Sequence, residues 1–151
     1  MKRSRLFITG ASGFIGTNLI ASLDPALWEV MNFSLSPPLN MEHMGTWHEG
    51  DIMDRNVLCD AINTFEPSAV VHMAARTDCD ENTAVEPDYR VNTSGTLNVA
   101  DATREAGGVE RFVMVSTQYV IGPETPLTDP YAYAPHTVYG MSKMAAELIV
   151  R

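Results

Sequence analysis

The residues of this chain best suited to chemistry are a tyrosine and a lysine near its C-terminal end. Tyr139 and Lys143 stand four positions apart in a segment predicted to be helical, which puts both side chains on one helix face. A lysine ammonium beside a phenol stabilises the phenolate and lowers the pKa of the tyrosine. Such a tyrosine can act as a general base near neutral pH. The plainer interpretation of the same spacing is an exposed helix face.

A second candidate is a glycine-rich turn near the N-terminus. Gly10, Gly13 and Gly16 follow the apolar run Leu6–Thr9 and precede an amphipathic segment that starts at Phe14. Strand, tight turn and helix is the simplest interpretation. Glycines let a pyrophosphate approach backbone N–H groups at a helix N-terminus, where the helix dipole favours an anion. The spacing is GxxGxxG and not the usual GxGxxG, and a turn without a ligand is the alternative.

The elements that must position these residues alternate between short apolar strands and helices. The expected strands are Leu6–Thr9, Trp28–Phe33, a short strand ending at Gly50–Ile52, Ala69–Ala75 and Arg111–Ser116. The expected helices run from Phe14 to about Asp24, from Asp54 as N-cap to Phe65, over Asp88–Ala106, and from about Thr137 onward, still in progress at Arg151. Loops are expected over Leu39–Glu49 and Gly122–Pro135.

This alternation predicts an α/β fold, a doubly wound parallel sheet of the Rossmann type. Ligands of such sheets bind beyond the carboxyl ends of the strands. Three unusual stretches fall there, namely 10–16, 72–76 and 116–118, so we expect them to meet at one site.

Composition limits the class of protein further. At 151 residues the chain suits one domain, and its net charge of −9 argues against nucleic-acid binding. No apolar run approaches the length of a membrane span. Cys59 and Cys79 form no CxxC motif, which favours a reducing, cytoplasmic location. The spacing of the remaining candidate ligands matches no compact metal site, so a solvated loop is expected for Glu42, His43, His48 and Glu49.

Several motifs in order give the chain a resemblance to a known family. They are TGASGFIG, GDI, HMAA, YRVNTSGTLN, VSTQYVIG and VYGMSK, spread over almost all of the sequence. The chain resembles the extended short-chain dehydrogenase/reductases, that is the NAD-dependent epimerase/dehydratase family, and members like UDP-glucose 4-epimerase look closest.

The resemblance implies roles for individual residues. Thr117, Tyr139 and Lys143 would be catalytic: Tyr139 removes a proton from a sugar hydroxyl with the help of Thr117, and the same carbon gives a hydride to the nicotinamide. Asn92 would support the active-site helix. The cofactor would be bound by Gly10, Gly13, Phe14, Ile15, Gly16, Ser34, Asp51, Ile52, Ala74, Ala75, Arg76, Asn92, Ser116, Tyr139 and Lys143.

Two departures from the family pattern refine this expectation. Ser34 stands where the family usually has an aspartate that bonds the adenosine ribose; no arginine lies near it in the sequence, so NAD is preferred over NADP. Thr117 is followed by Gln118 and Tyr119, and not by the Asp-Glu pair of family dehydratases. A nucleotide-sugar epimerase is therefore expected, with a reductase or dehydrogenase as one alternative and a truncated, non-catalytic dinucleotide-binding module as the other.

The end of the chain bears on its activity. The resemblance implies that residues 1–151 form the dinucleotide-binding domain and that the family's C-terminal substrate domain is absent, so turnover by this chain alone is not expected. Leu148, Ile149 and Val150 would then be exposed. The resemblance also implies a homodimer through Asp88–Ala106 and the helix from Thr137 onward.

Overall fold

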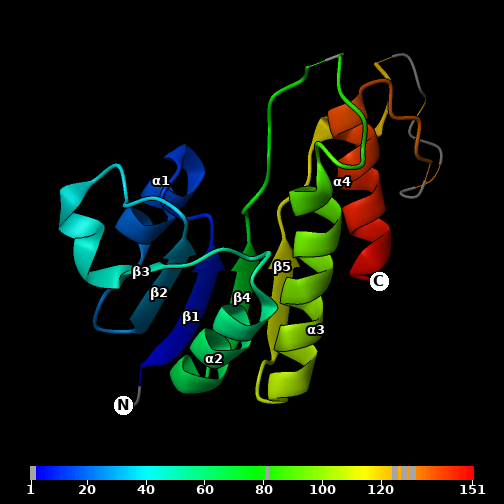
Figure 1. Ribbon diagram of the computed structural model, residues 1–151. Helices are drawn as coiled ribbons and strands as arrows, with labels where there is room; N and C mark the ends of the chain where they lie inside the picture. Colours follow the sequence, from blue (N-terminus) through cyan, green and yellow to red (C-terminus); the bar gives the residue numbers. More distant parts are fainter. Residues whose placement is uncertain (1–2, 81, 124–125, 127–128, 130–131) are drawn as a thin grey trace.

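The fold is a single parallel sheet with helices on both faces (Figure 1). The computed structural model describes residues 3–80, 82–123, 126, 129 and 132–151, so the expected loop over Gly122–Pro135 lies partly outside the described residues. The sheet has the strand order β3-β2-β1-β4-β5, and all its pairs are parallel. Its strands are β1 (Ser4–Thr9), β2 (Trp28–Ser34), β3 (Trp47–Glu49), β4 (Ala69–His72) and β5 (Arg111–Met114).

The four helices are placed between and after these strands. They are α1 (Phe14–Ser22), α2 (Arg55–Phe65), α3 (Thr96–Ala106) and α4 (Val138–Ile149). Three short turns complete the described elements: the 3₁₀-helices η1 (Met41–Thr46) and η3 (Gln118–Val120), and the π-helical turn η2 (Val91–Gly95). The predicted doubly wound α/β fold is confirmed.

Alternate side chains of the central strands build two separate cores. Phe7 and Val70 point to the face that α2 and α3 cover. Leu6 and Ile8 point to the opposite face, where Ile20 of α1 packs on them. Both faces are apolar, as a covered parallel sheet requires.

The second helix follows its sequence signals closely. The Asp54 carboxylate accepts hydrogen bonds from the N–H groups of Asn56 and Val57, which caps α2. The chain leaves the helix at Glu66, whose φ is +46°, just before Pro67. One face of α2 is apolar and buried through Leu58, Ala61, Ile62 and Phe65, whereas Val57 is 40% exposed.

The region before residue 50 differs from the expectation. Part of the segment predicted as a loop forms η1 and the strand β3, and β3 ends at Glu49, so the expected strand end at Gly50–Ile52 is wrong. Backbone pairing of Trp47 with Asn32 defines this three-residue strand. A strand so short has no apolar alternation, which is why the sequence pattern missed it.

Other elements differ from the prediction at their ends. β4 stops at His72 and β5 at Met114, although the N–H groups of the next residues, Met73 and Val115, still donate to the neighbouring strands. The helix expected from Asp88 begins with the π-turn η2 and is regular only from Thr96. The last helix was expected to continue at Arg151, but α4 ends at Ile149.

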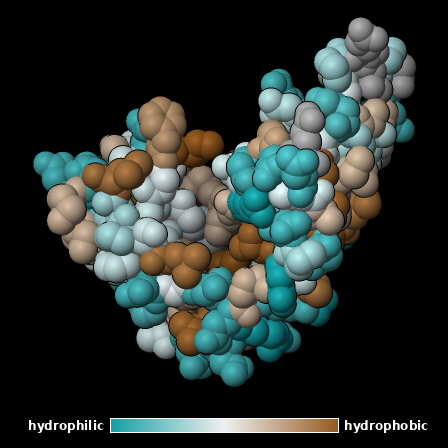
Figure 2. All heavy atoms as spheres, turned by 45° about the horizontal axis from the view of Figure 1, so that its top comes forward, coloured by the Kyte–Doolittle hydropathy of each residue, from teal (hydrophilic) through white to brown (hydrophobic). Residues whose placement is uncertain are grey.

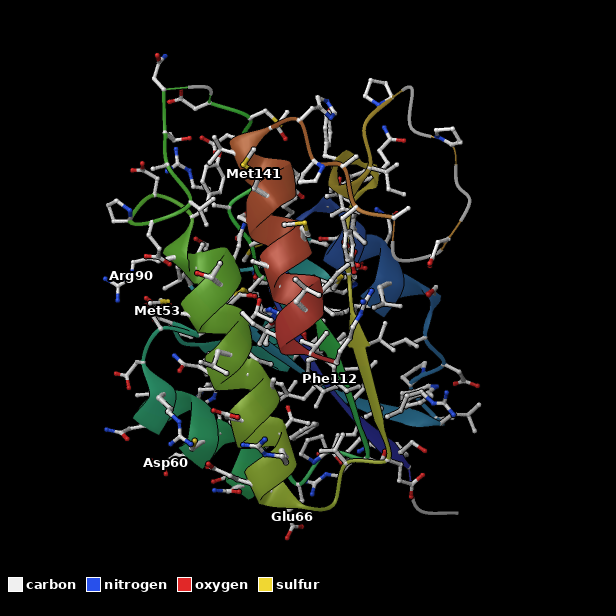
Figure 3. The ribbon with its side chains drawn as sticks, turned by 90° about the vertical axis from the view of Figure 1, so that its right-hand side faces the viewer. Met53, Asp60, Glu66, Arg90, Phe112 and Met141 are labelled. Atoms are coloured by element: carbon white, nitrogen blue, oxygen red, sulfur yellow. The ribbon has the colours of Figure 1, made fainter. Side chains whose placement is uncertain are left out.

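The last two helices lie side by side, on the side of the molecule next to β5 (Figure 3). In the part of the chain that the structure describes, no helix is long and apolar enough to cross a membrane.

Candidate functional site

A cleft lies at the carboxyl ends of the strands, where Figure 2 shows the molecule hollowed with apolar residues near the rim. Its volume is about 610 Å³, in the range of small-molecule sites. It is lined by Gly10, Ser12, Gly13, Phe14, Ile15, Gly16, Phe33, Ser34, Leu35, Ser36, Pro37, Leu39, Gly50, Asp51, Ile52, Met73, Ala74, Ala75, Thr77, Val115, Ser116, Tyr139 and Lys143.

The three positions of the first turn differ in whether the structure requires a glycine there. Gly10 has a φ of +76°, and a Cβ there would lie 2.6 Å from the backbone of Ala74. A Cβ on Gly16 would lie 2.2 Å from Ala11. A Cβ on Gly13 would meet nothing closer than 3.7 Å. Gly10 and Gly16 are therefore needed for packing, whereas Gly13 leaves open space at the cleft.

The start of α1 is suited to an anion. Gly13 is the N-cap residue, and no side chain caps the helix. N–H groups at such a terminus, together with the helix dipole, attract negative charge. A phosphate in the cleft would satisfy them.

The rim of the cleft is apolar. Phe14 and Ile15, which the resemblance implies as cofactor-binding residues, are 78% and 60% exposed and line the cleft. Leu35 and Leu39 add to the same rim and are 64% and 72% exposed. Exposed apolar residues concentrated around a hollow indicate a surface that a ligand covers.

Asp51 and Ile52, which the resemblance implies as cofactor-binding residues, also line the cleft. Asp51 accepts a hydrogen bond from the N–H group of Met53, which orients its carboxylate. Ile52 is buried, and its carbonyl accepts a hydrogen bond from the side chain of Asn98 on α3. The short turn after β3 is thus fixed from both sides.

Tyr139 and Lys143 lie at the opposite end of the cleft. Both come from the first turns of α4, where Thr137 caps the helix by accepting from the N–H group of Gly140. A Cβ on Gly140 would lie 2.2 Å from the carbonyl oxygen of Tyr119, so this glycine allows α4 to approach η3 closely. The exposed fractions of Tyr139 and Lys143 are only 9% and 2%.

Burial shifts the pKa values of this pair. It raises the pKa of Tyr139, while a hydrogen bond with Thr117 lowers it in part. It lowers the pKa of Lys143, against which the charge of Glu147 acts. The expectation that Lys143 lowers the pKa of Tyr139 is not met, because desolvation dominates and the ammonium is not among the groups that shift this phenol.

Two neighbouring residues at the end of β5 face different surroundings. Ser116 lines the cleft, and its hydroxyl donates to the carboxylate of Glu147 on α4. Thr117 does not line the cleft; its hydroxyl accepts from the N–H group of Tyr119 and bonds with Tyr139. Thr117 therefore touches the base candidate directly.

Ala74 and Ala75 line the cleft as expected, but Arg76 does not. The Arg76 guanidinium pairs with Asp78 at 2.7 Å and lies 4.7 Å above the ring of Tyr89. These contacts draw it to the loop side, away from the cleft.

Asn92 is fully buried and supports the site from behind. Its side chain accepts from the backbone N–H of Arg76 and donates to the carbonyl of the same residue, at 2.8 and 2.9 Å. It also lies 2.9 Å from the hydroxyl of Ser142 on α4. Asn92 thus joins the loop after β4 to the helix that bears Tyr139.

His72 is a hydrogen-bonded core residue. Its Nδ1 lies 2.7 Å from the hydroxyl of Thr9, and its Nε2 lies 2.8 Å from the hydroxyl of Thr96. Because the Thr96 hydroxyl donates to the Asn92 carbonyl, Nε2 carries the ring proton. Burial and the charge of Lys143 lower the pKa of His72 to about 3, so the ring is neutral.

Several lining residues escaped the sequence analysis. Ser12, Leu35 and Leu39 come together only through folding, and the last two carry no polar group that signals a site. The proximity of Glu147 to Lys143 could have been predicted from the sequence, because a spacing of four puts both residues on one helix face. The two histidines considered as metal ligands lie in different surroundings: His43 is buried in η1, and His48 is exposed on β3.

The strand order 3-2-1-4-5 with a glycine turn between β1 and α1 defines a dinucleotide-binding domain of the Rossmann type. The family model described as "NAD dependent epimerase/dehydratase family" matches residues 6–151. The chain therefore belongs to this family.

Individual relatives agree with this assignment. UDP-glucose 4-epimerase from Vibrio cholerae is 33% identical, with 94% of this chain and 44% of the relative covered. The 3 beta-hydroxysteroid dehydrogenase/Delta 5-->4-isomerase from Mycobacterium tuberculosis is also 33% identical, with 97% and 42% covered. The relatives are enzymes, as predicted for the family, and the chain spans less than half the length of these two.

Solved structures are similar over the same part. The enzyme WbmG from Bordetella bronchiseptica, in complex with NAD, has a TM-score of 0.84 and 31% identity, with 99% of this chain and 49% of WbmG covered. A dTDP-4-dehydrorhamnose reductase from Bacillus anthracis, in complex with NADP, has a TM-score of 0.77 and 27% identity, with 99% and 50% covered. These two neighbours thus hold NAD in one case, the cofactor preferred from the sequence, and NADP in the other.

Proposed function

We propose that this chain is the cofactor-binding part of an NAD-dependent nucleotide-sugar epimerase. The observation that supports this most is one continuous cleft with an anion-suited glycine turn at one end and Tyr139 with Lys143 at the other. UDP-glucose 4-epimerases from Vibrio cholerae and other organisms are among the similar proteins. The apolar rim and the uncapped start of α1 fit a dinucleotide, with residues around Gly13 at its phosphates.

The proposed chemistry assigns each residue of the chain a limited task. NAD, when bound, supplies a hydride acceptor. Tyr139 takes the proton of a sugar hydroxyl, and Thr117 orients its phenol. Lys143 lies on the same helix face and is the lining cation that can bond the nicotinamide ribose. Ala74, Ala75 and Ser116 line the way to this end.

A reductase or dehydrogenase that uses the same residues is the second candidate, and the similar NADP-bound reductase supports it. A dehydratase is not proposed, because Gln118 and Tyr119 offer no carboxylate for the removal of water. Incubation with a UDP-sugar and NAD separates the two candidates: an epimerase interconverts sugars without lasting absorbance of reduced cofactor, whereas a dehydrogenase accumulates it.

A third candidate is a dinucleotide-binding module that performs no chemistry. It would bind NAD through the glycine turn as the epimerase does, but it would neither interconvert sugars nor reduce the cofactor. The burial of Tyr139 and Lys143, and the hydrogen bond between Tyr139 and Thr117, support the enzyme.

Two further proposals concern the setting of the protein. Both cysteines are free thiols, Cys59 partly buried and Cys79 exposed, which supports the cytoplasm as its location. A homodimer through α3 and α4 is supported by apolar side chains exposed on these helices, Leu97, Met141 and Leu148.

The cofactor site is tested by calorimetric titration with NAD. Gly13→Val should weaken binding at least about tenfold, because the side chain fills the space left for a phosphate. The melting temperature should stay close to that of the wild type, since the new Cβ would lie no closer than 3.7 Å to its nearest neighbour, the carbonyl oxygen of Gly10. Gly45→Ala, in open space on η1, is the matched control and should change neither quantity. The proposal fails if the wild type binds no NAD or if Gly13→Val binds it equally well.

A further inference from the structure

Three polar side chains form a continuous series of hydrogen bonds at the carboxyl end of β2. Asn32 is fully buried in the strand, and Ser34 follows two residues later with 6% exposure. Ser12 joins them from the glycine turn. Both serines line the cleft, whereas Asn32 lies behind them.

The direction of each hydrogen bond in this network follows from the available protons. The hydroxyl of Ser12 donates to the carbonyl oxygen of Ser36 at 2.6 Å, and a carbonyl can only accept. Ser12 therefore accepts from its other partner, the amide nitrogen of Asn32, at 3.0 Å. The amide oxygen of Asn32 then faces Ser34, whose hydroxyl donates to it at 2.6 Å.

Each of the two serine hydroxyls thus donates its only proton to another atom of the protein. What they still offer to the cleft is lone pairs, so each can accept a hydrogen bond but cannot donate one. A ligand atom at this end must be a donor to be satisfied. An acceptor there would lose its bonds to water and gain none, which is costly in a partly enclosed site.

The ligand group expected at the end of the second strand is the adenosine ribose. Its 2′-hydroxyl can donate, but the 2′-phosphate of NADP has only acceptors when fully ionised. Among the described lining residues the one lysine or arginine is Lys143, at the other end of the cleft, and the charged group at this end is the Asp51 carboxylate. We propose that the Ser12–Asn32–Ser34 network selects NAD against NADP by presenting acceptors alone. This inference rests on the proposed cofactor site.

The experiment compares calorimetric binding of NAD and of NADP. The wild type should bind NAD at least about tenfold more tightly. Ser34→Ala removes one acceptor and should weaken NAD about threefold to tenfold while NADP changes little. Asn32→Leu frees the Ser34 proton to turn toward a phosphate, so NADP should bind more tightly while NAD changes less than about twofold. Ser22→Ala, on the exposed side of α1, is the control and should behave as the wild type.

Failure of this inference differs from failure of the proposed function. If the wild type binds neither nucleotide, the cofactor site itself is wrong. If it binds both equally, or if Ser34→Ala weakens both equally, the site stands and the selection is wrong. An Asn32→Leu protein that folds with an unchanged preference also overturns the inference. Should that variant not fold, Ser34→Asp decides: it should keep NAD binding and weaken NADP further, and NADP binding equal to that of the wild type would contradict the proposal.

Discussion

At the scale of single residues, the most constrained group is the buried imidazole of His72. It receives a hydrogen bond from Thr9 on β1 and donates one to Thr96 on α3, so it links the centre of the sheet to a helix that covers it. Its pKa of about 3 shows that the fold accepts only the neutral ring. The unfolded chain has no such restriction, and stability therefore depends on pH through this residue.

We expect the free energy of unfolding to fall as the pH drops below about 6.5, the pKa of a histidine in the unfolded chain. Below that value the unfolded state binds a proton that the folded state does not bind until about pH 3. One such proton changes the free energy by up to about 1.4 kcal/mol per pH unit. Urea denaturation between about pH 5 and about pH 7.5 measures this slope.

The matched variants are His72→Gln and His48→Gln. The first removes the depressed pKa and should flatten the slope, although it lowers stability at neutral pH by disturbing two buried hydrogen bonds. The second changes an exposed side chain on β3 and should leave the slope unchanged. Equal slopes for wild type and His72→Gln would show that other groups cause the pH dependence.

The sequence predicted those site residues whose type and spacing are themselves the signal. Tyr139 and Lys143 share a helix face at a separation of four, and Gly13 is recognisable between two other glycines. The position of Arg76 was not predictable, because Asp78 and Tyr89 draw its side chain to the loop. The role of Asn32 was equally hidden, since it depends on two serines that only the folded chain brings to it.

At the scale of elements, α2 is the helix whose boundaries were predicted best. Its start depends on one carboxylate: Asp54 accepts two backbone N–H groups of the first turn. Asp54→Ala should lower the free energy of unfolding by about 1 kcal/mol, as the loss of an N-cap does. Thermal or urea unfolding measures this loss.

The control for this prediction is Asp60→Ala on the same helix. Asp60 is exposed near the middle of α2 and caps nothing, so the change should stay within about 0.5 kcal/mol. Equal effects of the two substitutions would mean that charge or helix propensity, and not the cap, stabilises α2.

Elements that are defined by backbone hydrogen bonds, and not by the periodicity of apolar residues, were predicted poorly. β3 is a strand because the backbone of residues 47–49 bonds to β2. The start of the third long helix was misjudged because a π-turn at 91–95 keeps a helical sequence pattern with a different hydrogen-bond ladder. Local periodicity contains neither kind of information.

At the scale of the whole molecule, apolar surface remains exposed on one side. Leu148 on α4 is 53% exposed and Val113 on the edge strand β5 is 45% exposed, whereas Ile149 and Val150 are partly covered. Figure 3 shows α3 and α4 beside each other on this side, with Met141 on α4. The expectation of fully uncovered Leu148, Ile149 and Val150 therefore holds for the first of the three.

We expect this surface to support a dimer that static light scattering detects in solution. Leu148→Glu places a charge among the apolar residues of α4 and should shift the protein toward the monomer. Leu27→Glu is the control, because Leu27 is 57% exposed and lies before β2, away from both helices, and the dimer should persist. A monomeric wild type at all concentrations would contradict the proposed assembly.

The π-turn η2 also restricts how the length of this chain can vary. Each residue added to or removed from a helix turns everything before it by about 100°. Loss of one residue between Arg90 and Gly95 would give a regular α-helix, but it would rotate Asn92 away from Ser142 and from the backbone of Arg76. In aligned relatives that keep these contacts, substitutions at Thr93 or Ser94 should therefore be common, and single-residue gaps in this turn should be rare.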